Sequence, residues 1–97
     1  MAKKGYWVVC YKSVKDPAAL AEYKKLAAVS VEAKGGRAIV AADPARVHES
    51  GINQQVVIVE FDDVQKAIAA YETDSYKQAL RALGNGVERD FRIIEGR

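Results

Sequence analysis

The segment QVVIVEFDD, residues 55–63, decides the fold, because it combines the pattern of a covered strand with a carboxylate inside that strand. Its valines, isoleucine and phenylalanine favour strands, and a continuous apolar run is typical of a strand covered on both faces. Glu60 interrupts the run just before the acidic pair Asp62–Asp63. A carboxylate in this position needs a cation, hydrogen bonds or water, unless it has a chemical role. Glu60 is therefore either a member of an ion pair or a candidate general base.

Strand and helix patterns alternate outward from this segment. Asp16–Pro17 is a typical helix start, and Gly35–Gly36 is a typical helix end. Asp62, with Gln65 three residues later, predicts a capping box, and Thr73–Asp74–Ser75 predicts a second cap that divides the following helix. We expect strands at 5–13, 37–42, 54–61 and 87–96, with helices from Pro17 to Gly35 and over 63–83.

The order β-α-β-β-α-β predicts an α+β, ferredoxin-like fold with a four-stranded antiparallel sheet, in one domain spanning 1–97. In this topology strands 5–13 and 54–61 are central, and the helices cover only one face of the sheet. Both central strands are apolar on both faces, so the second face needs a covering partner. We predict a homodimer in which two sheets meet as a dimeric α/β barrel. The two faces of strand 5–13 are Tyr6, Val8 and Cys10, and Trp7, Val9 and Tyr11.

Composition and charge argue against several other classes of protein. The net charge is +2 and charged residues of both signs are mixed along the chain, without the clustered basic face of a nucleic-acid-binding protein. No apolar run is long enough to span a membrane, and the first residues lack the apolar core of a signal peptide. We expect a cytoplasmic protein that binds neither nucleic acid nor membranes. The single cysteine excludes an internal disulfide, and no His/Cys cluster predicts a metal site.

Several short blocks, by their order and spacing, resemble a known bacterial family. They are KGYW at 4–7, DP..L.EY at 16–23, GGR at 35–37, VEFDD at 59–63, Tyr71, Tyr76, Arg81 and D..IIEG at 90–96. Over almost the whole chain they resemble the family called domain of unknown function 1330. The resemblance implies membership of the dimeric α/β-barrel superfamily, which includes cofactor-free monooxygenases, small-molecule isomerases and haem-degrading proteins. The family itself has no settled activity, and we expect no cofactor.

Two tyrosines and two arginines are the candidate ligand-binding residues. Tyr71 and Tyr76 lie on the apolar faces of their predicted helices, where most tyrosines are core residues with a hydrogen-bonded hydroxyl. Beside a break between helices, they could instead offer donors to a small carbonyl or phenol ligand. Arg81 is either a solvated helix residue or a carboxylate clamp, and Arg37 begins the strand beside that of Glu60.

Glu60 and His48 are the candidate catalytic residues. His48, the only histidine, lies between two turns and is an acid–base candidate, although a lone loop histidine is usually a surface residue. Cys10, in the middle of a strand, is expected to be buried and inert. For Glu60 we favour an ion pair with Arg37 or Arg92. Arg37 is the better partner, because its strand directly adjoins that of Glu60 in the expected sheet order.

These features favour a protein that binds a small metabolite in a cleft between sheet and helices. The alternative is a cofactor-free enzyme, monooxygenase-like or isomerase-like, that acts on a small carbonyl or aromatic compound. Glu60 or His48 would then be the base, with Tyr71 and Tyr76 orienting the ligand. A Glu60 carboxylate in a closed cavity facing the helices, without an arginine nearby, would favour the enzyme. An arginine within salt-bridge distance would favour a structural role for Glu60.

Overall fold

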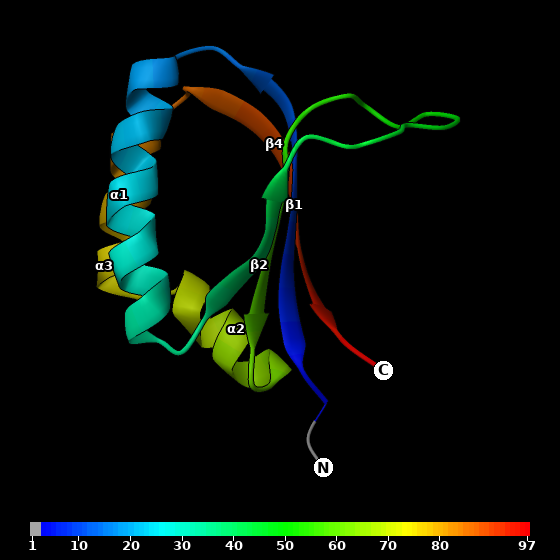
Figure 1. Cartoon of the computed structure of the whole chain (residues 1–97). Helices are drawn as coiled ribbons and strands as arrows, with labels where there is room; N and C mark the ends of the chain where they lie inside the picture. Colours follow the sequence, from blue (N-terminus) through cyan, green and yellow to red (C-terminus); the bar gives the residue numbers. More distant parts are fainter. Residues whose placement is uncertain (1–2) are drawn as a thin grey trace.

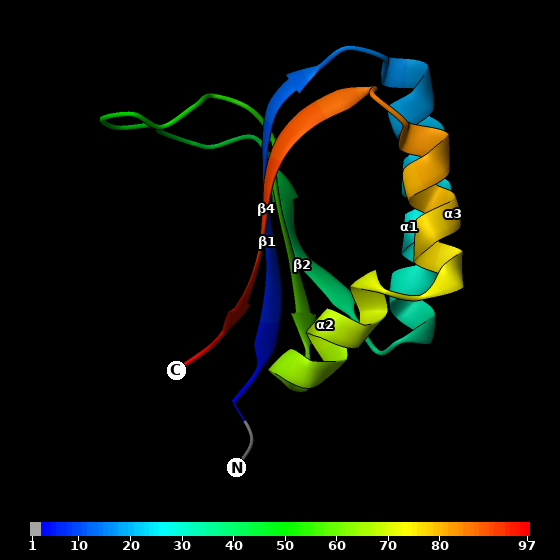
Figure 2. The ribbon, with the colours of Figure 1, turned by 180° about the vertical axis from the view of Figure 1, so that it is seen from behind.

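Helices cover one face of a four-stranded antiparallel sheet in the computed structural model, which describes residues 3–97 (Figures 1 and 2). This is the predicted ferredoxin-like α+β fold, with the second helical region divided in two. No helix in residues 3–97 is long and apolar enough to cross a lipid bilayer. The elements are β1 (Gly5–Val14), α1 (Pro17–Ala33), β2 (Arg37–Ala42), β3 (Val56–Phe61), α2 (Val64–Tyr71), α3 (Asp74–Leu83) and β4 (Val87–Glu95).

The sheet order is β2-β3-β1-β4, with β1 and β3 in the centre as predicted. Trp7 pairs with Val59 of β3 and with Ile93 of β4, so these three residues lie on one face of the sheet. β2 is the edge strand beside β3, and all six of its residues are exposed. The helices therefore cover the sheet less completely at β2 than over its central strands.

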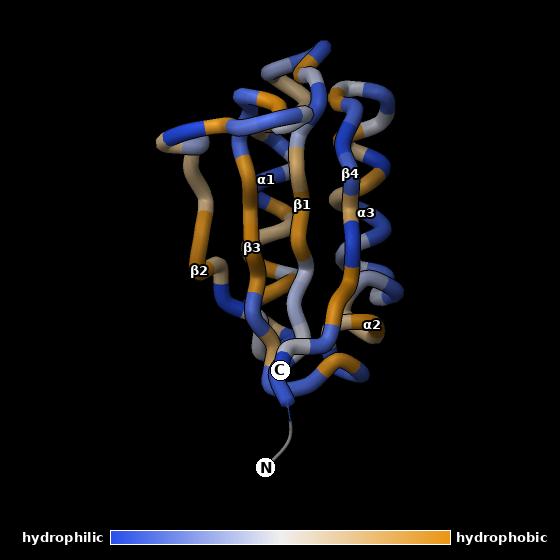
Figure 3. Tube along the Cα trace, turned by 90° about the vertical axis from the view of Figure 1, so that its right-hand side faces the viewer, coloured by the Kyte–Doolittle hydropathy of each residue, from blue (hydrophilic) through white to orange (hydrophobic). Residues whose placement is uncertain are grey.

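Alternation along β1 separates two environments. Trp7, Val9 and Tyr11 face the helices and are at most 3% exposed. Val8 and Cys10 lie on the opposite face, which the helices leave uncovered; Figure 3 shows this face, with the helices behind the strands. The prediction that Cys10 is buried is wrong for the single chain, because the side chain projects from this outer face.

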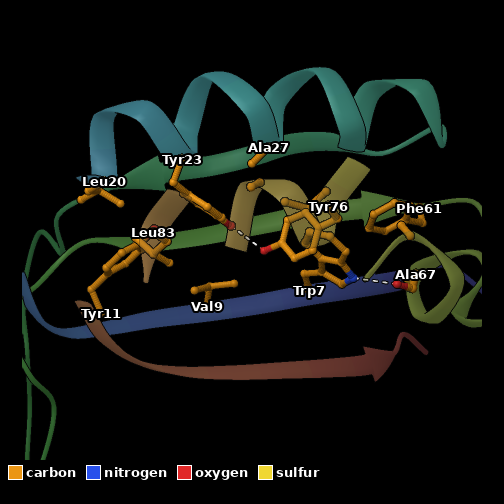
Figure 4. Close-up of a cluster of buried hydrophobic side chains, with 13 residues drawn as sticks. Trp7, Val9, Tyr11, Leu20, Tyr23, Ala27, Phe61, Ala67, Tyr76 and Leu83 are labelled. Atoms are coloured by element: carbon orange, nitrogen blue, oxygen red, sulfur yellow. Dashed lines mark hydrogen bonds between the residues drawn. The ribbon is translucent and has the colours of Figure 1, made fainter. Parts of the chain in front are cut away.

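An aromatic cluster fills part of the space between the sheet and the helices (Figure 4). Trp7, Phe61 and Tyr76 are the largest fully buried side chains. The ring centroid of Trp7 lies 5.2 Å from that of Phe61 and 5.0 Å from that of Tyr76, distances at which tilted aromatic rings attract one another. The Trp7 Nε1–H donates to the Ala67 carbonyl, 2.8 Å away, so the buried indole has no unpaired donor. This bond ties α2 to the central strand.

Side-chain caps determine where the helices begin. Asp16 caps α1 and Thr73 caps α3, each by accepting a hydrogen bond from the backbone N–H three residues later. The predicted cap at Asp62 is wrong, because Asp63 caps α2 by accepting from the Lys66 N–H at 2.8 Å. Asp63 has the extended backbone of a cap residue, whereas the Asp62 side chain is exposed and forms ion pairs with surrounding cations.

Residues 43–55 form a long loop between β2 and β3 that extends away from the helices (Figures 1 and 2). The loop contains no strand, so β3 begins at Val56 rather than at Gln54. His48 lies on this loop and is exposed, as expected for a histidine between two turns.

Replacing Asp63 with alanine should lower the free energy of unfolding by about 1 kcal/mol, because an N–H in the first turn of α2 would lose its acceptor. Asp62→Ala is the matched control, and it should cost less because it removes only exposed ion pairs. Urea unfolding followed by circular dichroism measures both changes. An equal or larger loss for Asp62→Ala would contradict the cap assignment.

Candidate functional site

A cavity of about 240 Å³ lies between the inner face of the sheet and α1. Its walls are mostly apolar and include Trp7 of β1, Val57 and Val59 of β3 and Phe91 of β4. The volume is just below the range of roughly 300–1,000 Å³ that is usual for small-molecule sites. The cavity therefore suits a small ligand.

Alanines leave this space open. Ala27 and Ala28 of α1 line one wall, and Ala38 and Ala41 of β2 line the opposite layer. Larger side chains at these positions would fill the cavity. Because Ala38 and Ala41 are also exposed, the cavity reaches the surface beside β2.

One cationic side chain enters the interior from β4. Arg89 pairs with Tyr11 across the sheet, so it lies on the inner face. Its Nη1 donates to the Tyr23 hydroxyl at 3.1 Å and its Nη2 to the Tyr76 hydroxyl at 3.4 Å. The two hydroxyls are hydrogen-bonded to each other at 2.5 Å, as Figure 4 shows. The guanidinium carbon lies 4.9 Å from the centre of the Tyr23 ring and 5.1 Å from that of Phe91, so aromatic rings surround the cation.

Arg89 has no carboxylate partner among residues 3–97. None of the ion pairs formed within residues 3–97 includes it. Burial alone would lower the pKa of Arg89, but its phenol partners raise the pKa above its already high ordinary value, so the guanidinium stays charged. Burial, followed by the neighbouring Tyr23, raises the pKa of the Tyr76 hydroxyl well above its ordinary value, so it stays protonated. The polar end of the cavity thus places one positive charge beside hydroxyl groups.

Glu60 lies on the opposite face of the sheet from this cavity. Its Oε1 accepts hydrogen bonds from the Nη2 of Arg37 at 2.7 Å and from the Nε at 3.1 Å. The Tyr6 hydroxyl donates to Oε2 at 3.3 Å. The predicted ion pair with Arg37 is therefore confirmed, whereas Arg92 pairs with Asp90. The general-base interpretation placed Glu60 between sheet and helices, whereas strand alternation directs its side chain away from the helices.

The other predicted ligand-binding residues belong to the core or the surface. Tyr76 is fully buried and reaches the cavity only through its hydrogen bonds to Tyr23 and Arg89. Tyr71 is half-buried, and its ring centroid lies 5.1 Å from that of Tyr76. Arg81 is exposed on α3. None of Tyr71, Tyr76 and Arg81 lines the cavity.

His48 lines a second hollow, about 410 Å³, between residues 43–55 and the outer face of the sheet. Cys10 and Asp90 line the same hollow. Glu60 does not line it, so the two candidate catalytic residues are not brought together. No group of three or more His, Cys, Asp or Glu side chains within residues 3–97 is placed to hold a metal ion.

Sequence reasoning missed Arg89 and Tyr23, the polar residues at the inner end of the cavity. The segment VERDFRII, residues 87–94, contains a signal for Arg89. Counting from its first residue, every second position is apolar except Arg89, and the other charged residues occupy the positions between. An arginine on an apolar strand face is a candidate for a covered site. Which face the helices cover follows only from the register with β1.

The sequence profile of a family described as "Domain of unknown function (DUF1330)" matches residues 4–97. No curated protein sequence matches the chain. Among solved structures, the chain is similar to RPA0582, a protein of unknown function from Rhodopseudomonas palustris. The likeness covers 100% of this chain and 85% of that one, with a TM-score of 0.75 and 13% identity.

Two further solved structures have the same fold. SnoaB, a cofactor-independent oxygenase from Streptomyces nogalater, is similar over 99% of this chain and 95% of its own, with a TM-score of 0.67 and 13% identity. A dimeric ferredoxin-like protein of unknown function from Thermobifida fusca is similar over 98% of this chain and 92% of its own, with a TM-score of 0.64 and 9% identity. At these identities the likeness establishes the shared fold alone.

Replacing Glu60 with glutamine should destabilise the protein at neutral pH but not in acid. Hydrogen bonds and charge from Arg37 hold the pKa of Glu60 below its ordinary value of 4.5. A carboxyl whose pKa is lower in the folded state stabilises the fold above its unfolded pKa, and this contribution disappears as the pH falls through the folded pKa. The urea midpoints of wild type and variant should therefore differ at neutral pH and converge as the pH falls through the lowered pKa of Glu60. A pH-independent difference would contradict a charged pair.

Proposed function

Because the chain belongs to the DUF1330 family, a membership that assigns no reaction, we propose a function from the cavity itself: the protein binds a small metabolite between the sheet and α1. The observation that carries this proposal is the mostly apolar cavity of about 240 Å³, with Arg89 and the Tyr23 hydroxyl at its inner end. Small-molecule sites typically combine apolar concave walls with a few placed polar groups.

The packing around the cavity supports binding. An empty apolar cavity lacks the van der Waals contacts that a filled core would make, and so it lowers stability. Four alanines on two facing elements keep the space open, although larger apolar residues would pack it. A ligand would restore these contacts, so the alanines are better explained by binding than by packing alone.

A cofactor-free enzyme is the second candidate. SnoaB, which shares the fold, is a cofactor-independent oxygenase, and the aromatic residues Trp7, Tyr23 and Phe91 would pack well against a flat aromatic substrate. The cavity lining within residues 3–97, however, includes no histidine, carboxylate or cysteine that could act as a base. Burial also raises the pKa of the Tyr11 hydroxyl, which disfavours it as a base. Binding is therefore the function that we propose first.

The proposal includes pairing of two copies through the outer face of the sheet. Val8, Ile58 and Val40 are aligned across this face in neighbouring strands. Val40 is 39% exposed and Ile94, on the same face of β4, is 44% exposed. A second copy of this face would remove the aligned apolar side chains from water. The Thermobifida fusca protein, which shares the fold, is described as dimeric.

Sedimentation velocity at micromolar concentration should give the mass of two chains. Ile58→Lys should shift the species to a monomer, because an unpaired charge would be buried in the middle of the interface. Val29→Lys is the matched control: Val29 is 72% exposed on α1, and the dimer should persist. A wild-type monomer, or a dimer that tolerates Ile58→Lys, would count against this pairing.

Ligand-observed NMR with a library of small aromatic and aliphatic acids, amides and alcohols tests the cavity. Ala41→Leu fills part of the cavity and should weaken its ligands by about tenfold or more, equivalent to at least about 1.4 kcal/mol. Ala42→Leu makes the same change on the outer face, where Ala42 pairs with Val56, and should leave binding unchanged. Ligands that bind Ala41→Leu as tightly as wild type do not occupy the cavity, and a library without ligands would overturn the proposal.

A further inference from the structure

We infer that the metabolite is a small organic monoanion whose carboxylate binds Arg89 while its apolar body lies against the sheet; this inference rests on the proposed function. The inference is based on the charges that border the cavity. Arg89 and Lys24 are both positive, and no aspartate or glutamate of residues 3–97 lines the cavity. A cavity with positive charge and apolar walls complements an anion with an apolar body and disfavours a cation.

Arg89 differs from two other arginines of the sheet in having no acidic partner in the part of the chain that the structure describes. Arg37 lies 2.7 Å from Glu60, and Arg92 lies 2.9 Å from Asp90. Both of these arginines are exposed, so water also stabilises their charge, whereas Arg89 is half-buried. Removing a cation from water is unfavourable unless hydrogen bonds and an opposite charge compensate. The phenol partners of Arg89 supply the hydrogen bonds, and a bound carboxylate would supply the charge.

The guanidinium of Arg89 retains donors for a ligand. Nη1 bonds to Tyr23 and Nη2 to Tyr76, while the other N–H groups, Nε–H among them, form no hydrogen bond within residues 3–97. A carboxylate can accept two parallel N–H bonds from one guanidinium. If the Tyr76 hydroxyl donates to Tyr23, the Tyr23 O–H is free to donate to the same anion.

The aromatic rings around Arg89 hold the guanidinium without neutralising it. The rings of Tyr11, Tyr23 and Phe91 have centroids 5.9, 4.9 and 5.1 Å from the guanidinium carbon. Their faces attract a cation through a quadrupole but carry no net charge. The site therefore presents a positioned cation for which the described residues supply no counter-ion.

The small, apolar cavity favours a singly charged ligand over phosphate. A phosphate dianion would lose more hydration on entering apolar walls than a single half-buried guanidinium offsets. Lys24 adds little positive potential at the inner end of the cavity, because it is exposed and its Nζ lies 3.4 Å from the Gln55 side-chain oxygen. An aromatic or aliphatic carboxylate matches the site better, with its charged end at Arg89 and its apolar end against Val57 and Val59.

Two acid–amide pairs of nearly equal shape test this inference: benzoate with benzamide, and hexanoate with hexanamide. Binding can be followed at neutral pH by calorimetry and by the fluorescence of Trp7, the only tryptophan, which lines the cavity. At least one acid should bind the wild-type protein at least about tenfold more tightly than its amide.

Variants of Arg89 test whether this residue causes the preference for the acid over the amide. Arg89→Gln should reduce the affinity for the acid to that for the amide, and Arg89→Lys should keep part of the preference. Arg92→Gln is the matched control, since it removes an arginine of the same strand from the outer face. Circular dichroism verifies that each variant is folded. If Arg89→Gln does not fold, the wild-type pairs and Arg89→Lys still decide the question.

The outcomes separate this inference from the proposed function. Equal affinity of acids and amides, or a preference for acids that survives Arg89→Gln, would overturn the inference alone. Cavity ligands from the NMR library that are all neutral would do the same. Both the inference and the proposed function fail if no ligand among the four probes and the library binds Ala41→Leu more weakly than the wild-type protein.

Discussion

The side chain of Trp7 connects the layers of this molecule. It lies on the central strand, its indole N–H is bonded to α2, and its ring packs against aromatic residues of β3, α3 and β4. Core substitutions that remove such a ring typically cost about 3–5 kcal/mol. This cluster packs near α2, and the cavity lies beneath α1, where small alanine side chains line it. Trp7 and Phe91 thus belong both to this aromatic cluster and to the wall of the cavity.

Much of the fold could be predicted because local signals agree with the topology. The sheet order places the strand of Arg37 beside that of Glu60, and the register then sets the two residues opposite each other, where they form the ion pair. Alternation divides a strand into two faces but does not say which face the helices will cover. For this reason Cys10 was misplaced and Arg89 was missed. Asp62 and Asp63 have equal intrinsic capping propensity, so only the path of the backbone decides between them.

The polar end of the cavity could not be found as a motif because its parts come from distant elements. Tyr23 belongs to α1, Tyr76 to α3 and Arg89 to β4, and only the packed fold brings them within hydrogen-bond distance. Tyr76 was predicted as a candidate ligand-binding residue, and in the fold its hydroxyl is hydrogen-bonded to Tyr23 and Arg89 without lining the cavity. A helix residue that hydrogen-bonds to another side chain has the same spacing in the sequence as one that only packs in the core. Periodicity therefore cannot distinguish the two.

The exposure of β2 has a consequence for solubility. Its sequence RAIVAA carries one charge, at Arg37, and its outer edge has unpaired backbone groups. An apolar edge strand of this kind can template pairing with other chains and so promote aggregation. The irregularity between Ala38 and Val40 distorts the ladder there, and such bulges make an edge a poorer template. An interaction that covers β2 would therefore also protect the chain from disordered association.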